Sequence, residues 1–438
     1  MKTVDVGGGG LAGSEAAYQV SKRGVAVRLY EMRPGQSSPA HHTDHLAELV
    51  CSNSLKSNQL DNASGLLKEE MRQLDSLIMQ VADSVRVPAG HALAVDREAF
   101  SNKVTERIQN MPNIQIIREE VKQLPSDDQD IWIIASGPLT SPSLLSSIQI
   151  EMGEPSLHFF DAAAPLISVD SIDFDKVYRA SRYDKGEADY LNCPFRKEEY
   201  ITFWHALVEA EQVELHDFEI GHFFEGCIPV EELARRGQET LAYGPLKPMG
   251  LKDPKTGITP YAVAQLRQDN VAGNLYGLVG FQTNLKFKEQ ERVFQKIPGL
   301  VKAEFVRYGV MHRNAYIRSP KWLSSSMQLK HRQNIFFAGQ ISGVEGYMES
   351  TASGLLCGVN AALLACDKEP LVMPRETMMG ALLHYVSHCD DTMFQPMNAV
   401  FGIIPPLNQP IRNKKLRYQQ YSDRALFALQ NWKACNHI

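Results

Sequence analysis

Three glycines near the start of the chain and one acidic residue have the types and spacing that suit a dinucleotide. Gly8, Gly10 and Gly13 form a G-x-G-x-x-G pattern between a predicted strand and a predicted helix, and Glu31 ends the next predicted strand. The first glycine permits a tight turn, the second lets the backbone approach a pyrophosphate, and the third allows close helix packing. The helix N-terminus attracts phosphate, while the carboxylate accepts hydrogen bonds from the adenosine ribose. The pattern predicts a dinucleotide site; the alternative is a glycine turn with only a structural role.

A second glycine-rich segment lies near residue 340. The sequence predicts a buried strand that ends before Gly339, a glycine turn, and then a helix of small residues that includes Gly354. A helix N-terminus near Gly354 would direct its partial positive charge at a flavin and its phosphates. This second closing element favours FAD over NAD, and Gly339 and Gly354 are expected cofactor contacts. The alternative is a buried strand and helix with packing glycines.

Two of the seven cysteines have the context of a reactive thiol. Cys227 precedes a proline and an acidic helix start, a position that favours the thiolate, and Cys51 precedes a polar turn that would expose it. The remaining five are expected to be buried, small apolar side chains, at positions 193, 357, 366, 389 and 435. Because no C-x-x-C pair occurs, a zinc site, a disulfide framework and a disulfide oxidoreductase are all disfavoured.

The charge balance limits how the chain could meet nucleic acid. There are 45 Lys+Arg against 51 Asp+Glu, a formal net charge of −6, so the field of the whole molecule does not attract RNA. Contact would need local basic patches, and the candidates are Arg179, Arg182 and Lys185; Arg235 and Arg236; Lys286 and Lys288; and Arg412, Lys414, Lys415 and Arg417. Most such clusters in proteins are simply solvated faces.

Other features argue for a cytoplasmic protein without metal. No run of about 18 apolar residues occurs, and the N-terminus enters a strand without a secretory signal. The histidines at 41, 42 and 45 and Asp44 lack a partner set for a metal, so we expect them to form a polar wall of the cofactor cleft. No membrane contact is expected.

The elements that would position these residues form an α/β fold. Residues 3–31 read as strand, glycine loop, helix and strand; residues 66–83 as one amphipathic helix; and 114–117 and 131–135 as short buried strands. We expect a Rossmann-like FAD-binding domain built from 1–150 and 301–370. Residues 151–300 would be an inserted α+β domain that faces the substrate or RNA, with a helix at 200–211 and strands at 262–266 and 275–282. Residues 371–438 would be a helical C-terminal segment.

Several long motifs resemble one family. They include GLAGSEAA (10–17), AELVCSNSLKSN (47–58), FFEGCIPVEELARRG (223–237) and FFAGQISGVEGYMES (336–350). They are similar to the folate- and FAD-dependent tRNA (uracil-C5) methyltransferases of bacteria, from the first strand to about residue 410. A more distant likeness to the larger flavoproteins that modify wobble uridines in tRNA implies a glucose-inhibited-division-like flavoprotein fold.

The resemblance implies a reaction and roles for named residues. The protein would methylate C5 of the T-loop uridine in tRNA, with methylenetetrahydrofolate as carbon donor and FAD reduced by NADPH or NADH. Cys227 would add to uracil C6, Cys51 would lie close to the flavin, and the ring of Tyr347 could stack on flavin or pterin. Glu345 and Glu349 share that loop, but the base that removes the C5 proton is not identified.

Three other functions are compatible with the same residues. The same chemistry on a ribosomal RNA uridine fits the same residues, as does a flavin-dependent NAD(P)H oxidoreductase without an RNA substrate. A folate- or RNA-binding flavoprotein without turnover is a third alternative, although the presence of both cysteines gives it no support. A monomer is the favoured oligomeric state.

Overall fold

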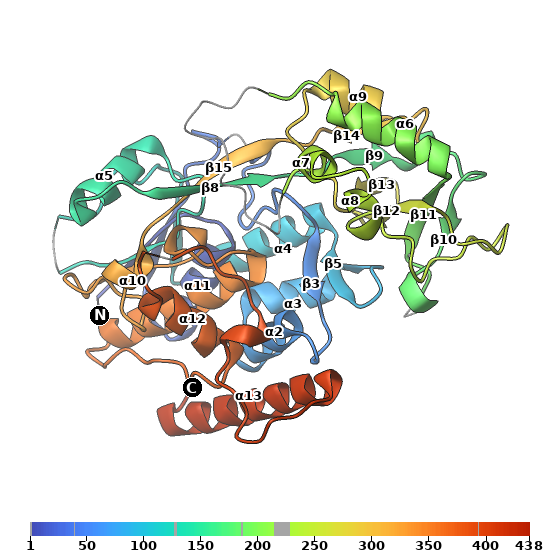
Figure 1. The fold of residues 1–438 in the computed structure, drawn as a ribbon. Coiled ribbons are helices and arrows are strands. Elements are labelled where there is room, and N and C mark those ends of the chain that lie inside the picture. Colours follow the sequence, from blue (N-terminus) through green and yellow to red (C-terminus); the bar gives the residue numbers. More distant parts are fainter. Residues whose placement is uncertain (1, 39, 127–128, 185–186, 214–227, 393) are drawn as a thin grey trace.

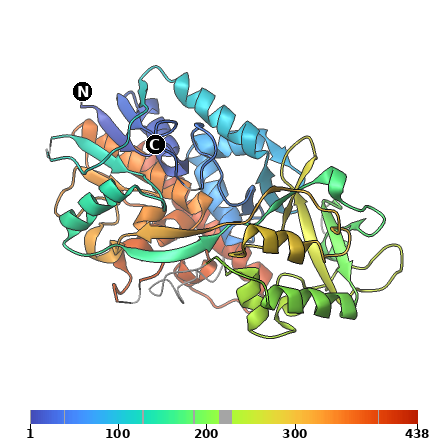
Figure 2. The same cartoon turned by 90° about the horizontal axis from the view of Figure 1, so that it is seen from above.

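Two separate hydrophobic cores organise the chain in this computed structural model, which describes residues 2–38, 40–126, 129–184, 187–213, 228–392 and 394–438. One core draws on residues 4–152 and 315–429, and the other on residues 167–303. Figure 1 shows the second unit, in green and yellow, to the right of the first, and Figure 2 shows the same division from above. We call the first unit the parental domain and the second the inserted domain.

A five-stranded parallel sheet lies at the centre of the parental domain. Its order is β16-β7-β1-β2-β6, and every neighbouring pair is parallel. The strands are β1 (Val4–Gly7), β2 (Val27–Tyr30), β6 (Ile114–Ile117), β7 (Ile131–Ile134) and β16 (Ile335–Phe337). Since parallel strands end at the same edge, the glycine loop after β1, Glu31 after β2 and Gly339 after β16 meet there, which is where open α/β sheets bind ligands.

Two helices pack against each other beside this sheet because glycines let their backbones approach. They are α1 (Leu11–Lys22) and α11 (Tyr347–Ala365). A Cβ atom on Gly354 would overlap the Ala12 backbone, and one on Gly358 would overlap Ala16 O. The expectation that a helix starts near Gly354 is therefore wrong: the helix starts at Tyr347, and Gly354 is a packing position inside it.

The single helix expected over residues 66–83 is also wrong. The structure has α2 (Ala63–Gln73) and α3 (Leu77–Ser84), separated by a short break. Asp75 adopts a left-handed φ of 59°, and the Ser76 side chain accepts a hydrogen bond from Met79 N, so a new helix N-cap starts there. The apolar face predicted for this segment is nevertheless buried.

The other elements of the parental domain surround the sheet. A small antiparallel sheet comprises β3 (Ser54–Ser57), β4 (Arg86–Val87) and β5 (Ala92–Val95). The remaining helices are α4 (Arg97–Gln109), α5 (Pro142–Met152), α10 (Ser319–Trp322), α12 (Met378–His388) and α13 (Lys414–Asn436). The described part of the tail after residue 371 thus contains two α-helices, and α13 lies along the lower side of the molecule in Figure 1.

The inserted domain is a six-stranded antiparallel sheet with helices. Its order is β10-β11-β12-β13-β9-β14. The elements are β9 (Leu166–Ser168), β10 (Tyr178–Arg179), β11 (Tyr190–Phe195), α6 (Lys197–Val208), α7 (Val230–Arg235), α8 (Thr240–Tyr243), β12 (Ala262–Gln268), β13 (Leu275–Leu278), α9 (Phe287–Phe294) and β14 (Phe305–Arg307). The chain leaves the parental domain through β8 (Leu157–Ala162) and returns through β15 (Met311–Tyr316), and these two strands pair antiparallel.

Candidate functional site

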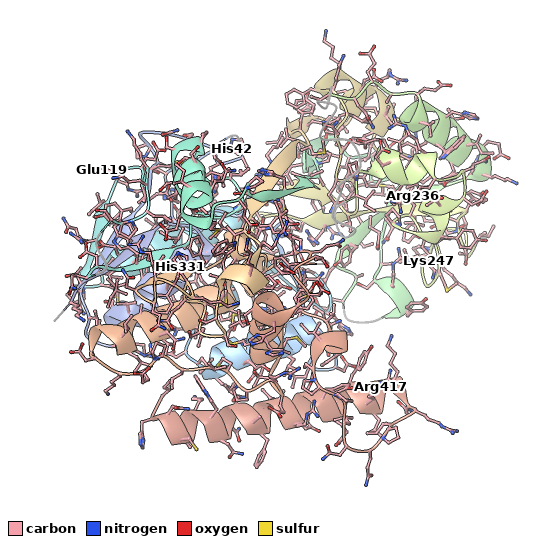
Figure 3. The ribbon with its side chains drawn as sticks, turned by 60° about the vertical axis from the view of Figure 1, so that its left-hand side comes forward. His42, Glu119, Arg236, Lys247, His331 and Arg417 are labelled. Carbon is pink, nitrogen blue, oxygen red and sulfur yellow. The ribbon has the colours of Figure 1, made fainter. Side chains whose placement is uncertain are left out.

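A cavity opens at the carboxyl edge of the parallel sheet. Its wall is made from the glycine loop after β1, the segment after β2, the turn after β7 and the turn after β16. The lining residues include Gly8, Gly10, Glu31, Arg33, His41, Glu119, Ser136, Gly137, Gly339, Gln340 and Tyr347. Figure 3 labels Glu119, one of these lining residues, at the upper left of the view. Glu119 follows β6, so the ends of all five strands of the sheet, although far apart in sequence, border one cavity.

The glycines of the loop differ in what they do. Gly8 has a left-handed φ of 115°, and a Cβ there would overlap the Ala135 backbone, so this turn needs glycine. A Cβ on Gly10 would meet nothing within 4 Å, so the backbone there borders open space in the cavity. Gly13 lies inside α1, where a Cβ would overlap Gly8 O, and it supports the loop from behind.

Two of the helix N-termini at the cavity lack a side-chain cap. The N-cap residues are Gly10 for α1 and Gly346 for α11, and neither has a side chain to satisfy the first backbone N–H groups. Such uncapped N–H groups together with the helix dipole suit the phosphates of a dinucleotide. The residues present therefore fit FAD at this place.

Glu31 is buried and ionised. Its carboxylate accepts hydrogen bonds from Gly9 N (3.1 Å), Arg33 N (3.0 Å), Arg33 Nε (2.9 Å) and Arg33 Nη2 (3.0 Å). Burial raises the pKa of Glu31. The hydrogen bonds and the positive charge of Arg33 lower the pKa by more than burial raises it, so the pKa lies below its usual value. Arg33 also pairs with Glu48 at 3.0 Å, so the acceptor predicted for a ribose stands within an ionic network.

Tyr347 connects this cavity to Cys51. The tyrosine hydroxyl donates to Cys51 Sγ at 3.2 Å and accepts from Cys51 N at 2.8 Å and Ser52 N at 3.3 Å. Burial, with the neighbouring Cys51, raises the pKa of Tyr347 well above its usual value, so the phenol stays protonated and can donate. Cys51 itself lines a second cavity, together with Ser52, Arg97, Arg267 and residues of the inserted domain.

Arginines from both domains hold the segment that carries Cys51. Arg97, the first residue of α4, donates to Leu49 O at 2.6 Å. Arg267, on β12, donates to Ser52 Oγ at 2.7 Å and Asn53 Oδ1 at 3.0 Å. Arg307, at the end of β14, donates to Cys51 O at 3.4 Å.

The other expected site residues are distributed as follows. Cys227 lies outside the described residues, and helix α7, expected after it, starts at Val230. Glu345 and Glu349 are buried, and neither is among the described residues that line the dinucleotide cavity. Glu349 Oε1 accepts hydrogen bonds from Lys56 Nζ and Ala399 N, both at 3.0 Å. These bonds give Glu349 a structural role, because they connect α11 to two neighbouring segments.

The remaining cysteines only partly match their expected burial. Cys193 and Cys357 are buried, and burial raises the pKa of both thiols. Cys366 and Cys435 are exposed, so the expected burial is wrong for these two; both lie at C-terminal helix ends, where few neighbours can cover them. Cys389 is half-buried.

The structure also bears on the histidines near residue 41, on metal binding and on membrane-spanning helices. His41 lines the dinucleotide cavity, and its Nδ1 lies 2.6 Å from Ser38 Oγ. Across the described ranges, no group of three or more His, Cys, Asp or Glu side chains is arranged to hold a metal ion. Within the same residues, no helix combines the length and apolar character needed to cross a bilayer.

Four arginines of the site, Arg33, Arg97, Arg267 and Arg307, are not among the site residues predicted from the sequence. A signal existed for Arg267, because a charged residue within the apolar run of β12 has to find a partner inside the protein. No local pattern distinguishes Arg97 or Arg307 from an ordinary exposed arginine.

The parallel sheet, glycine loop, paired helices and antiparallel insertion define a GidA-type FAD-binding fold. The solved structure of Aquifex aeolicus GidA shares this fold, with a TM-score of 0.68 over 99% of this chain and 75% of that chain, at 16% sequence identity. That identity is low enough that the likeness concerns the fold alone.

Sequence comparison identifies the family. The glucose inhibited division protein A family matches residues 3–369. A protein of Lactiplantibacillus plantarum named methylenetetrahydrofolate--tRNA-(uracil-5-)-methyltransferase TrmFO is 58% identical over 433 residues, 99% of this chain and 98% of the relative. A Bacillus cereus protein of the same name is 57% identical, over 98% of this chain and 99% of the relative. The chain belongs to the glucose inhibited division protein A family and, within it, to this group of methyltransferases, as the sequence motifs predicted.

Proposed function

We propose that this protein methylates C5 of the T-loop uridine in tRNA, with methylenetetrahydrofolate as carbon donor and FAD reduced by NADPH or NADH. The observation that carries the proposal is that relatives 56–58% identical along nearly their whole length bear the name of this activity. We further propose that it acts in the cytoplasm as a monomer.

In this proposal the parental domain binds the flavin. The N–H groups at the starts of α1 and α11 would hold the phosphates, and Glu31 would accept a hydrogen bond from the ribose. Bound FAD would supply the electrons that turn the transferred one-carbon unit into a methyl group. The residues that line the cavity would fix the orientation of the flavin ring.

Two cysteine thiols are proposed to have separate roles in the reaction. Uracil C5 becomes nucleophilic when a thiolate adds at C6, and Cys227 is proposed for that addition because Pro229 and α7 follow it directly. Cys51 is proposed to act beside the flavin, since Tyr347 contacts both the cavity and the Cys51 sulfur. The target uridine would have to leave its loop to reach both.

Exposed basic side chains are the proposed contacts for RNA phosphates. Arg235 and Arg236 lie at the end of α7, close in sequence to Cys227, and Arg412, Lys414 and Lys415 precede or begin α13. Figure 3 shows Arg236 and Lys247 on the inserted domain and Arg417 near the start of α13, all on the right of the view. Lys185, another basic candidate of the inserted domain, lies outside the described residues.

The decisive experiment supplies FAD-loaded protein with isotope-labelled methylenetetrahydrofolate, NADPH and unmodified tRNA, then digests the RNA and searches for labelled ribothymidine. Cys227→Ser should abolish the label, whereas Cys366→Ser, at an exposed cysteine, should not. Label in ribosomal RNA but not tRNA would support the alternative substrate. Bleaching of the flavin by NADPH without label in any RNA would support an oxidoreductase.

A further inference from the structure

The segment that carries Cys51 is surrounded by more positive than negative charge. Three guanidinium groups contact it, from Arg97, Arg267 and Arg307, and we call them the arginine cluster. Only Asp269 forms a described ion pair with the cluster, through Arg97 at 2.9 Å. The side chains of Arg97 and Asp269 are 15% and 6% exposed, so solvent screens this charge only weakly.

Part of the hydrogen-bonding capacity of the cluster is unused. Arg307 Nε is buried and has no hydrogen-bond partner among the described residues, and its Nη2 makes a long bond of 3.4 Å to Cys51 O. Arg267 bonds only to neutral oxygens of Ser52 and Asn53 in the contacts described. A buried guanidinium without an anionic partner is costly, which implies that an anion belongs nearby.

Besides Asp269, a group beside the cluster that can become an anion is the sulfur of Cys51, which acts electrostatically on Arg97, Arg267 and Arg307. Burial and the charge of Arg97 together lower the pKa of Arg307 to about 10, although Asp269, Tyr347 and Cys51 each act to raise it. Burial also lowers the pKa of Arg267, and Tyr190, Asp269 and, to a smaller extent, Cys51 act to raise it. Tyr347, from α11, donates a hydrogen bond to the sulfur at 3.2 Å. Opposite charges and a donor both favour the ionised thiol.

We infer that the arginine cluster holds Cys51 as a thiolate in the FAD-loaded protein, and that Arg97, Arg267 and Arg307 are positioning residues that set the ionisation of this sulfur. Two of the three belong to the inserted domain, so the inserted domain controls the reactivity of a thiol carried by the parental domain. The use made of this thiolate rests on the proposed function, but its ionisation does not.

The test measures alkylation of individual cysteines. FAD-loaded protein receives short pulses of iodoacetamide between pH 5 and 9.5, and the rate at each cysteine is read by mass spectrometry of its peptide. Exposed Cys366 and Cys435 serve as internal references. The midpoint of Cys51 should lie below theirs, and Arg307→Gln should raise it by about 1 pH unit, since a nearby opposite charge typically shifts a pKa by that order.

Matched variants separate charge from folding. Arg307→Lys keeps the charge and should restore most of the lowered midpoint, whereas Arg107→Gln, at an exposed arginine of α4, should change nothing. Flavin content and thermal unfolding of each variant report whether the fold survives, and Arg267→Lys with Arg267→Gln repeats the comparison if Arg307→Gln does not fold. Three results would overturn the inference. The pH midpoint for alkylation of Cys51 could equal that of Cys366, it could stay unchanged in both Arg307→Gln and Arg267→Gln, or Cys51 could fail to react at every pH. The assay contains neither folate nor RNA, so failed methyl transfer would leave its result intact.

Discussion

The hydroxyl of Tyr347 is at once a donor to Cys51 Sγ, at 3.2 Å, and an acceptor from Cys51 N, at 2.8 Å. Cys51 belongs to the N-terminal segment of the parental domain and Tyr347 to its C-terminal segment. Tyr347 lines the dinucleotide cavity, and Cys51 lines the cavity beside the inserted domain. The tyrosine therefore fixes both the backbone and the sulfur of the cysteine.

Removing that hydroxyl should disturb Cys51 without emptying the flavin site. In Tyr347→Phe, the N–H groups of Cys51 and Ser52 lose their acceptor, which should lower the free energy of unfolding by about 1–2 kcal/mol. Cys51 should be alkylated more slowly at neutral pH because its thiolate loses a donor. Denaturant unfolding and peptide-resolved alkylation measure both effects. Tyr243→Phe, at a side chain that is 79% exposed, is the control; equal behaviour of the two variants would contradict the role of the hydroxyl.

Replacement of glycine by alanine should lower stability at some positions and raise it at another. Gly13→Ala and Gly354→Ala place a Cβ against backbone of Gly8 and Ala12, and overpacking of this kind typically costs about 1–3 kcal/mol. Flavin content should fall with Gly13→Ala because the loop is pushed forward. In Gly7→Ala the nearest atom is Val121 Cγ2 at 3.5 Å, an ordinary contact, and stability should rise by about 0.4–1 kcal/mol through the unfolded chain. Thermal unfolding with and without added FAD checks this order, which a destabilised Gly7→Ala would refute.

Glu31→Gln should weaken FAD binding and change the response to acid. Loss of a charged acceptor should raise the dissociation constant of FAD about tenfold, the equivalent of roughly 1.4 kcal/mol. The folded pKa of Glu31 lies below its usual 4.5, so its stabilisation is present above that pH and is lost as the pH falls through the folded value. The wild type should therefore lose more stability than Glu31→Gln below pH 4.5. Flavin fluorescence titration and acid unfolding are the measurements, and parallel acid curves would contradict the assignment.

Lys68 should make stability depend on alkaline pH. It is fully buried, its amine donates to Leu55 O and Ser64 O at 2.8 Å, and burial lowers its pKa to about 7. A lowered folded pKa means that the unfolded chain binds more protons between about pH 7 and 10, so stability rises with pH in that window. From pH 6.5 to 9.5 the gain relative to Lys68→Met should be about 3 kcal/mol, because one pKa unit corresponds to roughly 1.4 kcal/mol. Denaturant unfolding at the two pH values tests this, and an equal pH response of the two proteins would exclude it.

The sequence predicted those parts of the site whose signal is local. The glycine loop, Glu31, Gly339 and Tyr347 each follow or begin an element that periodicity reveals, and parallel strands must bring such ends to one edge. The starts and ends of helices were harder: the break at Asp75 depends on one left-handed residue and a serine cap, inside a pattern that is periodic throughout.

The arginine cluster could not be predicted in this way. Arg97, Arg267 and Arg307 lie in three segments that come together only in the folded protein. The apolar run of β12 indicates that Arg267 needs a partner, but nothing in the sequence identifies that partner. Convergence of this kind is a property of tertiary packing, and single-sequence patterns carry no information about it.

The pairing of Leu157–Ala162 with Met311–Tyr316 brings the two ends of the inserted sequence together. Excision of everything between Ala162 and Met311, with a tight turn in its place, would leave the nucleotide edge of the parallel sheet with all its strands. The shortened protein would also lack Asp269 and two of the three guanidiniums beside Cys51. Loading of the nucleotide and activation of the sulfur would then be separable by a single deletion.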